Sequence, residues 1–187
     1  ERLSIPGFIR GRRYQALQAS SQFFTYYETA APSVLVSQAY RDRLDAPSAL
    51  TTQIMKDIFL NMSRTICRCV ERLGGGRGSH CLTVSLPDSS SVVGLVGLLD
   101  NPAIVRAERW VAEPDINEPS AEEKLRGPDQ HIGSALFVET LRSSDLAEAA
   151  GLIESILRIN SPALSVSIDS WKLLGELESG EAQWQGP

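Results

Sequence analysis

Residues Ile5–Thr29 read IPGFIRGRRYQALQASSQFFTYYET, and the chain contains a second, altered copy of this stretch. Asn101–Glu113 (NPAIVRAERWVAE) matches its first half at an offset of 96 positions, with Pro102 on Pro6 (102 minus 6). Ile132–Thr140 (IGSALFVET) matches its second half at an offset of 111. The difference, 111 minus 96, indicates an insertion of 15 residues in the second copy. Two copies are too few for a solenoid and favour a fused pair of related domains.

Each copy has the residue pattern of a β-hairpin. β-branched and aromatic residues dominate it, and Gln18–Ser20 interrupts the first copy as a short polar turn. A turn centred near Ala19 places Arg10 opposite Glu28 across the hairpin, and the same register in the second copy places Arg106 near Glu139.

The remaining pattern alternates helices and strands. In the first copy, helical periodicity predicts a helix that starts at Ser33 and ends near Leu44, a second helix over Ala49–Leu60 and then a strand over Arg64–Arg72. In the second copy, we expect strands at Ser79–Leu86, Ala103–Ala112, Ile132–Thr140 and Leu164–Trp171, with a short helix between Asp88 and Leu99 and a longer one from Ser144 to Leu157.

The second copy therefore has the order strand, helix, strand, strand, helix, strand, which is the ferredoxin-like βαββαβ unit. We predict an α+β fold of tandem ferredoxin-like repeats over residues 1–74 and 79–178. Their antiparallel sheets are expected to pack face to face as an α/β barrel within one chain. The glycine-rich residues 74–78 join the repeats, and the charged, proline-rich residues 113–130 form an exposed insertion loop.

The first copy is expected to lack its N-terminal strand in this sequence. Glu1 corresponds to Gly97, while the second copy begins near Ser79. About 18 residues (97 minus 79) of the first copy are therefore unmatched, enough for a strand and the start of a helix. We expect this segment upstream of Glu1.

Composition narrows the class of partner. The chain has 187 residues, 42% of them hydrophobic, and a net charge of −5, without the basic stripe of a nucleic-acid-binding protein. It shows neither a signal peptide nor a run of the ~20 apolar residues that cross a membrane. Its three cysteines have no framework spacing, which indicates free thiols in a reducing compartment. We therefore expect a cytoplasmic protein with neither nucleic-acid nor membrane partners.

Three segments resemble the EthD-like members of the dimeric α/β-barrel superfamily: ERLSIPGFIRGRRY (Glu1–Tyr14), FFTYYET (Phe23–Thr29) and SQAYRDRLDAPSALT (Ser37–Thr51). The resemblance covers most of Glu1–Leu86 and extends more faintly over the second copy. It implies that two fused copies form a pseudo-dimer within one chain, present as a monomer or as a homodimer. Many EthD-like sequences carry a His…Glu-His motif just upstream of the Glu-Arg-Leu found at Glu1–Leu3, and this chain does not contain that motif.

The resemblance implies two alternative functions. Members of the superfamily include cofactor-free monooxygenases, polyketide cyclases, lactone isomerases and haem-handling proteins. The first hypothesis is a cofactor-free enzyme acting on a small hydrophobic or aromatic carbonyl compound, and the second is a non-catalytic ligand-binding or assembly protein. Fold alone does not decide between them. A cavity of ~300 Å³ between the sheets would favour a small-molecule site, whereas a core filled by Phe8, Phe24, Phe137 and Trp110 would favour a structural barrel.

Three residues are candidates for catalysis. Arg10 can hold an anionic or enolate group through its guanidinium, or simply pair with Glu28. Tyr26 can donate a phenolic hydrogen bond, or be a core tyrosine with a satisfied hydroxyl. His80 can act as a single acid–base residue, or be an ordinary strand histidine.

The residues that could hold a metal or a cofactor are few. Both histidines, His80 and His131, are expected near the starts of antiparallel neighbouring strands and therefore at opposite ends of the sheet. Cys67, Cys69 and Cys81 lack a C-x-x-C pair, and the glycine joint lacks the Lys-Ser/Thr of a phosphate loop. We expect no metal and no cofactor.

Overall fold

Seven strands form one antiparallel sheet in the computed structural model, which describes residues 1–187 apart from 59–61, 88–94, 117–128, 161–165 and 181–187. The strands are β1 (Phe8–Gln18), β2 (Phe23–Thr29), β3 (Cys67–Leu73), β4 (His80–Leu86), β5 (Ile104–Ala112), β6 (Ser134–Thr140) and β7 (Ile168–Glu178). The α-helices are α1 (Gln38–Asp45), α2 (Ala49–Asp57) and α4 (Leu146–Asn160). Short 3-10 helices lie at Arg2–Ser4, Pro32–Val36, Leu98–Asp100, Pro114–Ile116 and Ser143–Asp145. The predicted α+β class is confirmed.

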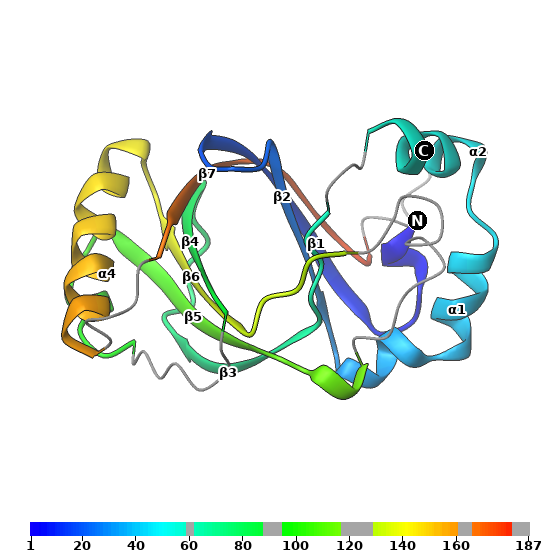
Figure 1. Cartoon of the computed structure of the whole chain (residues 1–187), viewed down its shortest axis with the longest axis horizontal. Coiled ribbons are helices and arrows are strands. Elements are labelled where there is room, and N and C mark those ends of the chain that lie inside the picture. Colours follow the sequence, from blue (N-terminus) through cyan, green and yellow to red (C-terminus); the bar gives the residue numbers. More distant parts are fainter. Residues whose placement is uncertain (59–61, 88–94, 117–128, 161–165, 181–187) are drawn as a thin grey trace.

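The strands follow the order β2-β1-β7-β4-β6-β5-β3. β7 pairs with β1 on one side and with β4 on the other, and β5 pairs with β3. The two sheets that were expected face to face are therefore joined at their edges into one. This sheet curls strongly, because Tyr26 of β2 and Trp110 of β5 stand far apart in the strand order yet their ring centroids are 5.3 Å apart. The result is a curled half-barrel (Figure 1).

Both predicted hairpins have the expected register. Arg10 lies opposite Glu28 in the first hairpin, and Arg106 lies opposite Glu139 in the β5–β6 pair. The register shifts between Phe8 and Arg10 in one and between Ile104 and Arg106 in the other, so the irregularity recurs 96 positions later (104 minus 8). A β-bulge of this kind re-aims the side chains that follow it.

Several element boundaries differ from the prediction. α1 starts after Ser37, whose hydroxyl accepts a hydrogen bond from the backbone N–H of Tyr40 (3.2 Å), and Ser33 lies in a 3-10 helix instead. A serine with this bond satisfies one of the free N–H groups of the first turn. β7 extends to Glu178, seven positions beyond the predicted end at Trp171 (178 minus 171), because β1 pairs with its second half.

Some predictions fall outside the described residues. The first part of the helix expected between Asp88 and Leu99 lies outside the described residues, and a 3-10 helix covers Leu98–Asp100. Most of the insertion loop at 113–130 and the start of the strand expected at Leu164 also lie outside them.

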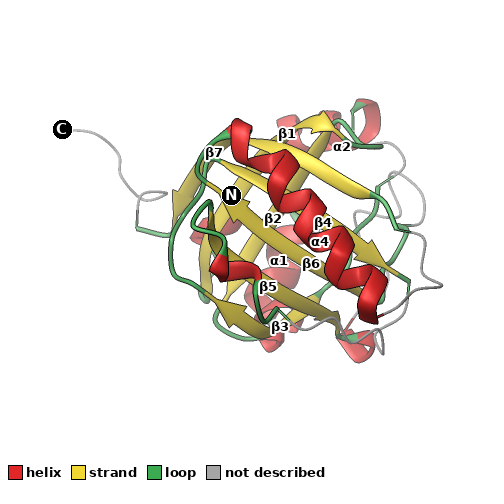
Figure 2. Ribbon diagram, turned by 90° about the vertical axis from the view of Figure 1, so that its left-hand side faces the viewer, coloured by secondary structure: helices red, strands yellow, loops and turns green. Residues whose placement is uncertain are grey.

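The helices cover the convex face of the sheet in two places. α4 lies across it (Figure 2), and the cluster beneath it includes Leu82, Val84, Leu136, Val138 and Ile153. α1 lies on the opposite side of the molecule, where Tyr40 stacks on Phe8 of β1 at a centroid distance of 5.9 Å (Figure 1). Burial of these apolar faces is the main source of stability for such layers. None of the helices in the described ranges has the length and hydropathy needed to cross a membrane.

Candidate ligand site on the concave face of the sheet

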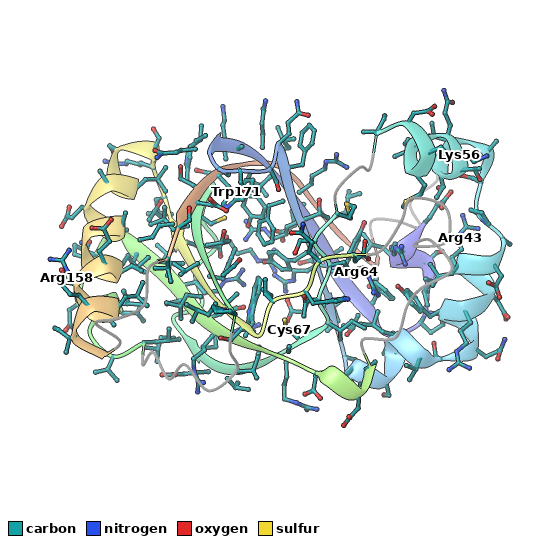
Figure 3. The ribbon with its side chains drawn as sticks, in the orientation of Figure 1. Arg43, Lys56, Arg64, Cys67, Arg158 and Trp171 are labelled. Atoms are coloured by element: carbon teal, nitrogen blue, oxygen red, sulfur yellow. The ribbon has the colours of Figure 1, made fainter. Side chains whose placement is uncertain are left out.

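The concave face of the sheet holds a cluster of six aromatic side chains. Tyr14, Phe137 and Trp171 are buried, whereas Phe24, Tyr26 and Trp110 are partly exposed. Trp110 stacks on Phe137 at a centroid distance of 5.0 Å. Figure 3 shows Trp171 among the strands, whereas Arg158 and Lys56 lie at the periphery on their helices. The alternation of side chains along each strand brings these rings to one face.

Arg12 of β1 lies next to this cluster and is 1% exposed. Its Nη1 pairs with Glu139 of β6, and its Nη2 donates a hydrogen bond to the carbonyl oxygen of Gly78 (2.9 Å). Its Nε lies 2.7 Å from Glu176 of β7, although this N–H is not aligned for a hydrogen bond. A buried guanidinium requires such partners because leaving water is costly for a charge.

Glu139, which is fully buried, links two arginines and a tyrosine. The Arg106 Nε lies 2.6 Å from its Oε2, again without hydrogen-bond alignment, and Tyr14 donates a hydrogen bond to its Oε1 (3.3 Å). Arg106 also donates from Nη2 to the Tyr26 hydroxyl (2.7 Å). Residues from two strands, β1 and β5, therefore converge on one carboxylate of β6, and Tyr26 of β2 is linked to it through Arg106.

A further group of charges lies toward β3. The Arg72 Nε is 2.8 Å from Glu108, and its Nη2 is 3.4 Å from Glu28. The indole N–H of Trp110 donates to Glu108 (2.7 Å). In total, this network joins five arginines to five glutamates: Arg10, Arg12, Arg72, Arg77 and Arg106 to Glu28, Glu108, Glu139, Glu176 and Glu178. The formal charges of these ten residues cancel.

Burial controls the acidity of this face. It raises the pKa of the Tyr14 and Tyr26 hydroxyls, so both remain protonated at neutral pH. Burial also raises the pKa of Glu139, and the neighbouring Arg106 and Arg12 oppose that rise. The pKa of the Cys81 thiol is raised well above its usual value for the same reason. Cys81 is therefore a neutral, unreactive thiol.

The three predicted catalytic residues have different surroundings. Tyr26 lies within the aromatic cluster and is held by Arg106. Arg10 is at the margin, with Nε 3.2 Å from Glu28 and weaker contacts to Glu176 (3.8 Å) and Glu178 (3.9 Å). His80 lies elsewhere, at the start of β4, where its Nδ1 is 2.9 Å from the Ser79 hydroxyl. The structure thus brings Arg10 and Tyr26 to one face and leaves His80 apart from them.

The other residues considered for metal binding do not converge. β4 and β6 pair from His80 opposite Thr140 to Leu86 opposite Ser134, so His131, which precedes β6, lies at the far end from His80. Cys69 is exposed, Cys67 is partly buried and Cys81 is buried. Within the described ranges, no three His, Cys, Asp or Glu side chains are grouped so that they could hold a metal ion.

Side chains fill the space on the concave side. The other five rings all have a centroid within 6.4 Å of the Phe24 ring, and the ion pairs occupy the region beside them. Shallow hollows of about 320 and 360 Å³ lie elsewhere, beside Ser4–Pro6 and along Cys69–Arg72. Phe24, Phe137 and Trp110 fill the core as expected for a structural barrel, whereas Phe8 packs under α1 on the other face.

The sequence pattern led to Arg10 as a candidate and not to Arg12, although Arg12 is the more deeply buried of the two. The alternation of charged and aromatic residues along the strands was the sequence signal that could have identified Arg12 as part of the site. Arg10, Arg12 and Tyr14 share one face of β1, as Arg106, Glu108 and Trp110 share one face of β5. Charges at every second position beside an aromatic residue mark a polar interior face.

Comparison with known proteins supplies a fold neighbour. No family model matches the chain, and no curated protein matches its sequence. A solved structure described as an anthrone oxidase-like protein superposes with a TM-score of 0.59 at 9% sequence identity. The match covers 98% of this chain and 84% of that one. At this identity the likeness concerns the fold alone, an α/β-barrel-like arrangement.

Proposed function

We propose that this protein is a cofactor-free enzyme that acts on a small, flat, aromatic carbonyl compound on the concave face of its sheet. One observation carries the proposal. The Tyr26 hydroxyl accepts a hydrogen bond from Arg106 (2.7 Å) inside a cluster of six aromatic side chains. The partly exposed rings of Phe24, Tyr26 and Trp110 offer a surface for stacking, and the Tyr26–Arg106 pair offers a polarised hydroxyl for a carbonyl oxygen.

The chemistry follows from the donors. A hydroxyl that accepts a hydrogen bond from a guanidinium keeps its own proton for an oxygen atom of the ligand. Donors directed at a carbonyl oxygen stabilise the enolate that forms when a conjugated C–H loses its proton. Glu139 contacts the same guanidinium at 2.6 Å, and burial raises its pKa. We assign Glu139 the role of positioning Arg106, and Tyr26 and Arg106 the role of holding the enolate oxygen, while the proton of the acidic C–H passes to solvent water.

The first substrate class to test is the aromatic ketones. The solved neighbour is described as anthrone oxidase-like, and anthrones are flat aromatic ketones with an acidic methylene group. In the oxidation of anthrone by dioxygen, the methylene carbon loses both hydrogens and gains one oxygen atom. The other oxygen atom leaves as water, so four electrons pass from carbon to dioxygen. The enolate is the electron-rich species that dioxygen attacks, and no other oxidant is required.

The test combines oxygen uptake with anthrone as the probe and two matched variants. Tyr26→Phe removes the hydroxyl from the concave face and should lower kcat/KM at least tenfold, the loss expected for a hydrogen bond made mainly in the transition state. Tyr27→Phe removes a hydroxyl from the next residue, which is 45% exposed, and should leave kcat/KM unchanged. Equal activity of the two variants would contradict the assignment.

A second candidate is a non-catalytic binding or assembly protein. The balanced charges and the close ring contacts of the concave face favour it, because a core that is already filled stabilises a fold without needing a ligand. Quenching of the Trp110 and Trp171 fluorescence by anthrone, without oxygen uptake or product, would support binding alone. If anthrone causes neither quenching nor oxygen uptake, the enzyme proposal is ruled out for this substrate class.

We also infer that the chain consists of two related ferredoxin-like units, residues 1–74 and 79–178, of the EthD-like kind. The shared register of the two hairpins supports this. The strand order β7-β4-β6-β5 also supports this inference. In this order, β4 and β5 run in the same direction with β6 between them, and β6 and β7 run in the same direction with β4 between them. Two interlocked split units of this kind make a ferredoxin-like sheet.

A further inference from the structure

The sheet has two free edges that face the same gap. β2 pairs only with β1 and β3 only with β5 among the described strands, and they stand at the two ends of the strand order. Yet the Arg72 Nη2 on β3 lies 3.4 Å from the Glu28 carboxylate on β2. Neighbouring strands lie ~4.8 Å apart, and an extended arginine and a glutamate together span roughly twice that distance. The two edges are thus close enough to share one strand.

Strand direction shows how many strands fit. Every pairing in the sheet is antiparallel, so direction alternates along the seven strands and the first, β2, runs the same way as the last, β3. A closed barrel of antiparallel strands needs an even number, so one further strand closes this sheet with antiparallel pairs on both sides. Direct pairing of β2 with β3 would be parallel, unlike every other pairing in the sheet.

The second hairpin provides the model for the missing position. β6 and β7 also run in the same direction, and β4 lies between them, antiparallel to both. β2 matches β6 in register, and Arg72 of β3 pairs with Glu108 as Glu176 of β7 pairs with Arg12. The position between β2 and β3 therefore corresponds to that of β4.

We propose that the gap between β2 and β3 binds an eighth β-strand, antiparallel to both, whose side chains alternate as those of β4 do. The 3-10 helix Arg2–Ser4 precedes β1 as Leu98–Asp100 precedes β5, 96 positions later (98 minus 2). The hollow of about 360 Å³ along Cys69–Arg72 marks the β3 side of the gap.

The chemistry of the strand follows from β4. There Leu82, Val84 and Leu86 face the helix layer, whereas Cys81 faces the concave cluster. We expect large apolar residues on the outer side of the eighth strand, beside Val70, which is 44% exposed. Small residues are expected on its inner side. Main-chain hydrogen bonds supply the affinity in this mode of strand addition, and the alternate side chains supply the specificity.

The first test adds a strand in trans to the full chain. The probe is a peptide with the sequence of Ser79–Leu86 in which Cys81 is replaced by serine, and amide hydrogen exchange is followed by NMR. Binding should slow exchange at least tenfold in both β2 and β3 and leave α4 unchanged. The same peptide N-methylated at alternate residues should protect only one of the two edges. Protection of β2 and β3 without peptide, increasing with protein concentration, would instead show that a second copy occupies the edges.

A second variant covers the case in which a free peptide binds too weakly. Because Glu1 aligns with Gly97, residues 79–96 can be attached directly to Glu1 without a linker. This chain should unfold at a higher urea concentration than a control in which the attached copy of His80–Leu86 is replaced by glycine and serine. If both extended chains unfold alike, and β2 and β3 exchange as in the original chain, the proposal is wrong. Neither measurement depends on enzymatic activity.

Discussion

Arg12 and Glu108 carry opposite charges at equivalent places in the two hairpins, 96 positions apart (108 minus 12), and each forms the same cross-strand ion pair. The Arg12 Nε lies 2.7 Å from Glu176 on β7, and Glu108 lies 2.8 Å from the Arg72 Nε on β3. In both pairs the residues are direct partners in the strand register. The hairpins therefore share their geometry, while the charges of this one ion pair are reversed.

Replacement of Arg12 should test how much this arrangement contributes to stability. Arg12→Met removes one of the two buried arginines that hold Glu139, together with a cation beside Glu176, so we expect a loss of about 3–5 kcal/mol in the free energy of unfolding. Urea denaturation measures it. The control is Arg41→Met on the exposed side of α1, with a change below about 0.5 kcal/mol. A similar small change for Arg12→Met would mean that the network is dispensable.

Two glycines of the joint between the hairpins should respond differently to alanine. A Cβ on Gly78 would lie 2.3 Å from the backbone oxygen of Thr140, and the Gly78 carbonyl also accepts the Arg12 hydrogen bond. Gly78→Ala must therefore shift the backbone, and we expect a clear loss of thermal stability. A Cβ on Gly75 meets nothing within 4 Å. Gly75→Ala should be neutral or stabilising by up to about 1 kcal/mol. Equal melting temperatures would contradict the close approach at Gly78.

The three thiols should differ in their rates of alkylation by iodoacetamide. Cys81 is fully buried with a strongly raised pKa and should react only after unfolding. Burial raises the pKa of Cys67 to about 11, so its reaction at pH 8 should be slow and should accelerate as the pH rises. Cys69 is exposed and should react first, although its pKa is also raised. Mass spectrometry of the labelled peptides gives the order, and rapid labelling of Cys81 in the native protein would refute it.

Asp169 of β7 should make stability depend on pH. Burial raises its pKa in the folded protein above the usual value near 3.8, so the folded state holds this proton to higher pH than the unfolded chain does. Stability associated with this group is therefore present at low pH and is lost as the pH rises through the folded pKa. Asp169→Asn cannot ionise and should gain stability relative to the original chain over that range. Parallel urea titrations at pH 3.5 and pH 6.5 measure this, and an unchanged difference would argue against the shift.

The hairpin register could be predicted from the sequence because it depends on local information. A strand alternates with a period of two and a short turn sets the pairing, so locating the turn near Ala19 was enough to place Arg10 opposite Glu28. The start of α1 was misplaced because Ser33 and Ser37 are both good capping residues. The 3-10 helix at Pro32–Val36 decided between them.

The centre of the candidate site depends on pairings that local patterns do not contain. Arg10 and Arg12 share one face of β1, so periodicity cannot rank them. Arg12 is the more buried because β7 adds Glu176 on one side and the curl of the sheet brings Glu139 of β6 close on the other. The continuity of the sheet was missed for the same reason, since edge pairing between distant strands has no signature in sequence spacing.

The place of β7 has a consequence for how the chain is made. β1 begins at Phe8, but its second neighbour begins at Ile168, so a ribosome must add about 160 residues (168 minus 8) before that edge can be covered. Until then, the nascent hairpin presents an unpaired strand edge of the kind that associates with other chains. Pairing so remote in sequence also makes folding slow. Productive synthesis of this protein should therefore depend on chaperones that shield the early hairpin until β7 has emerged.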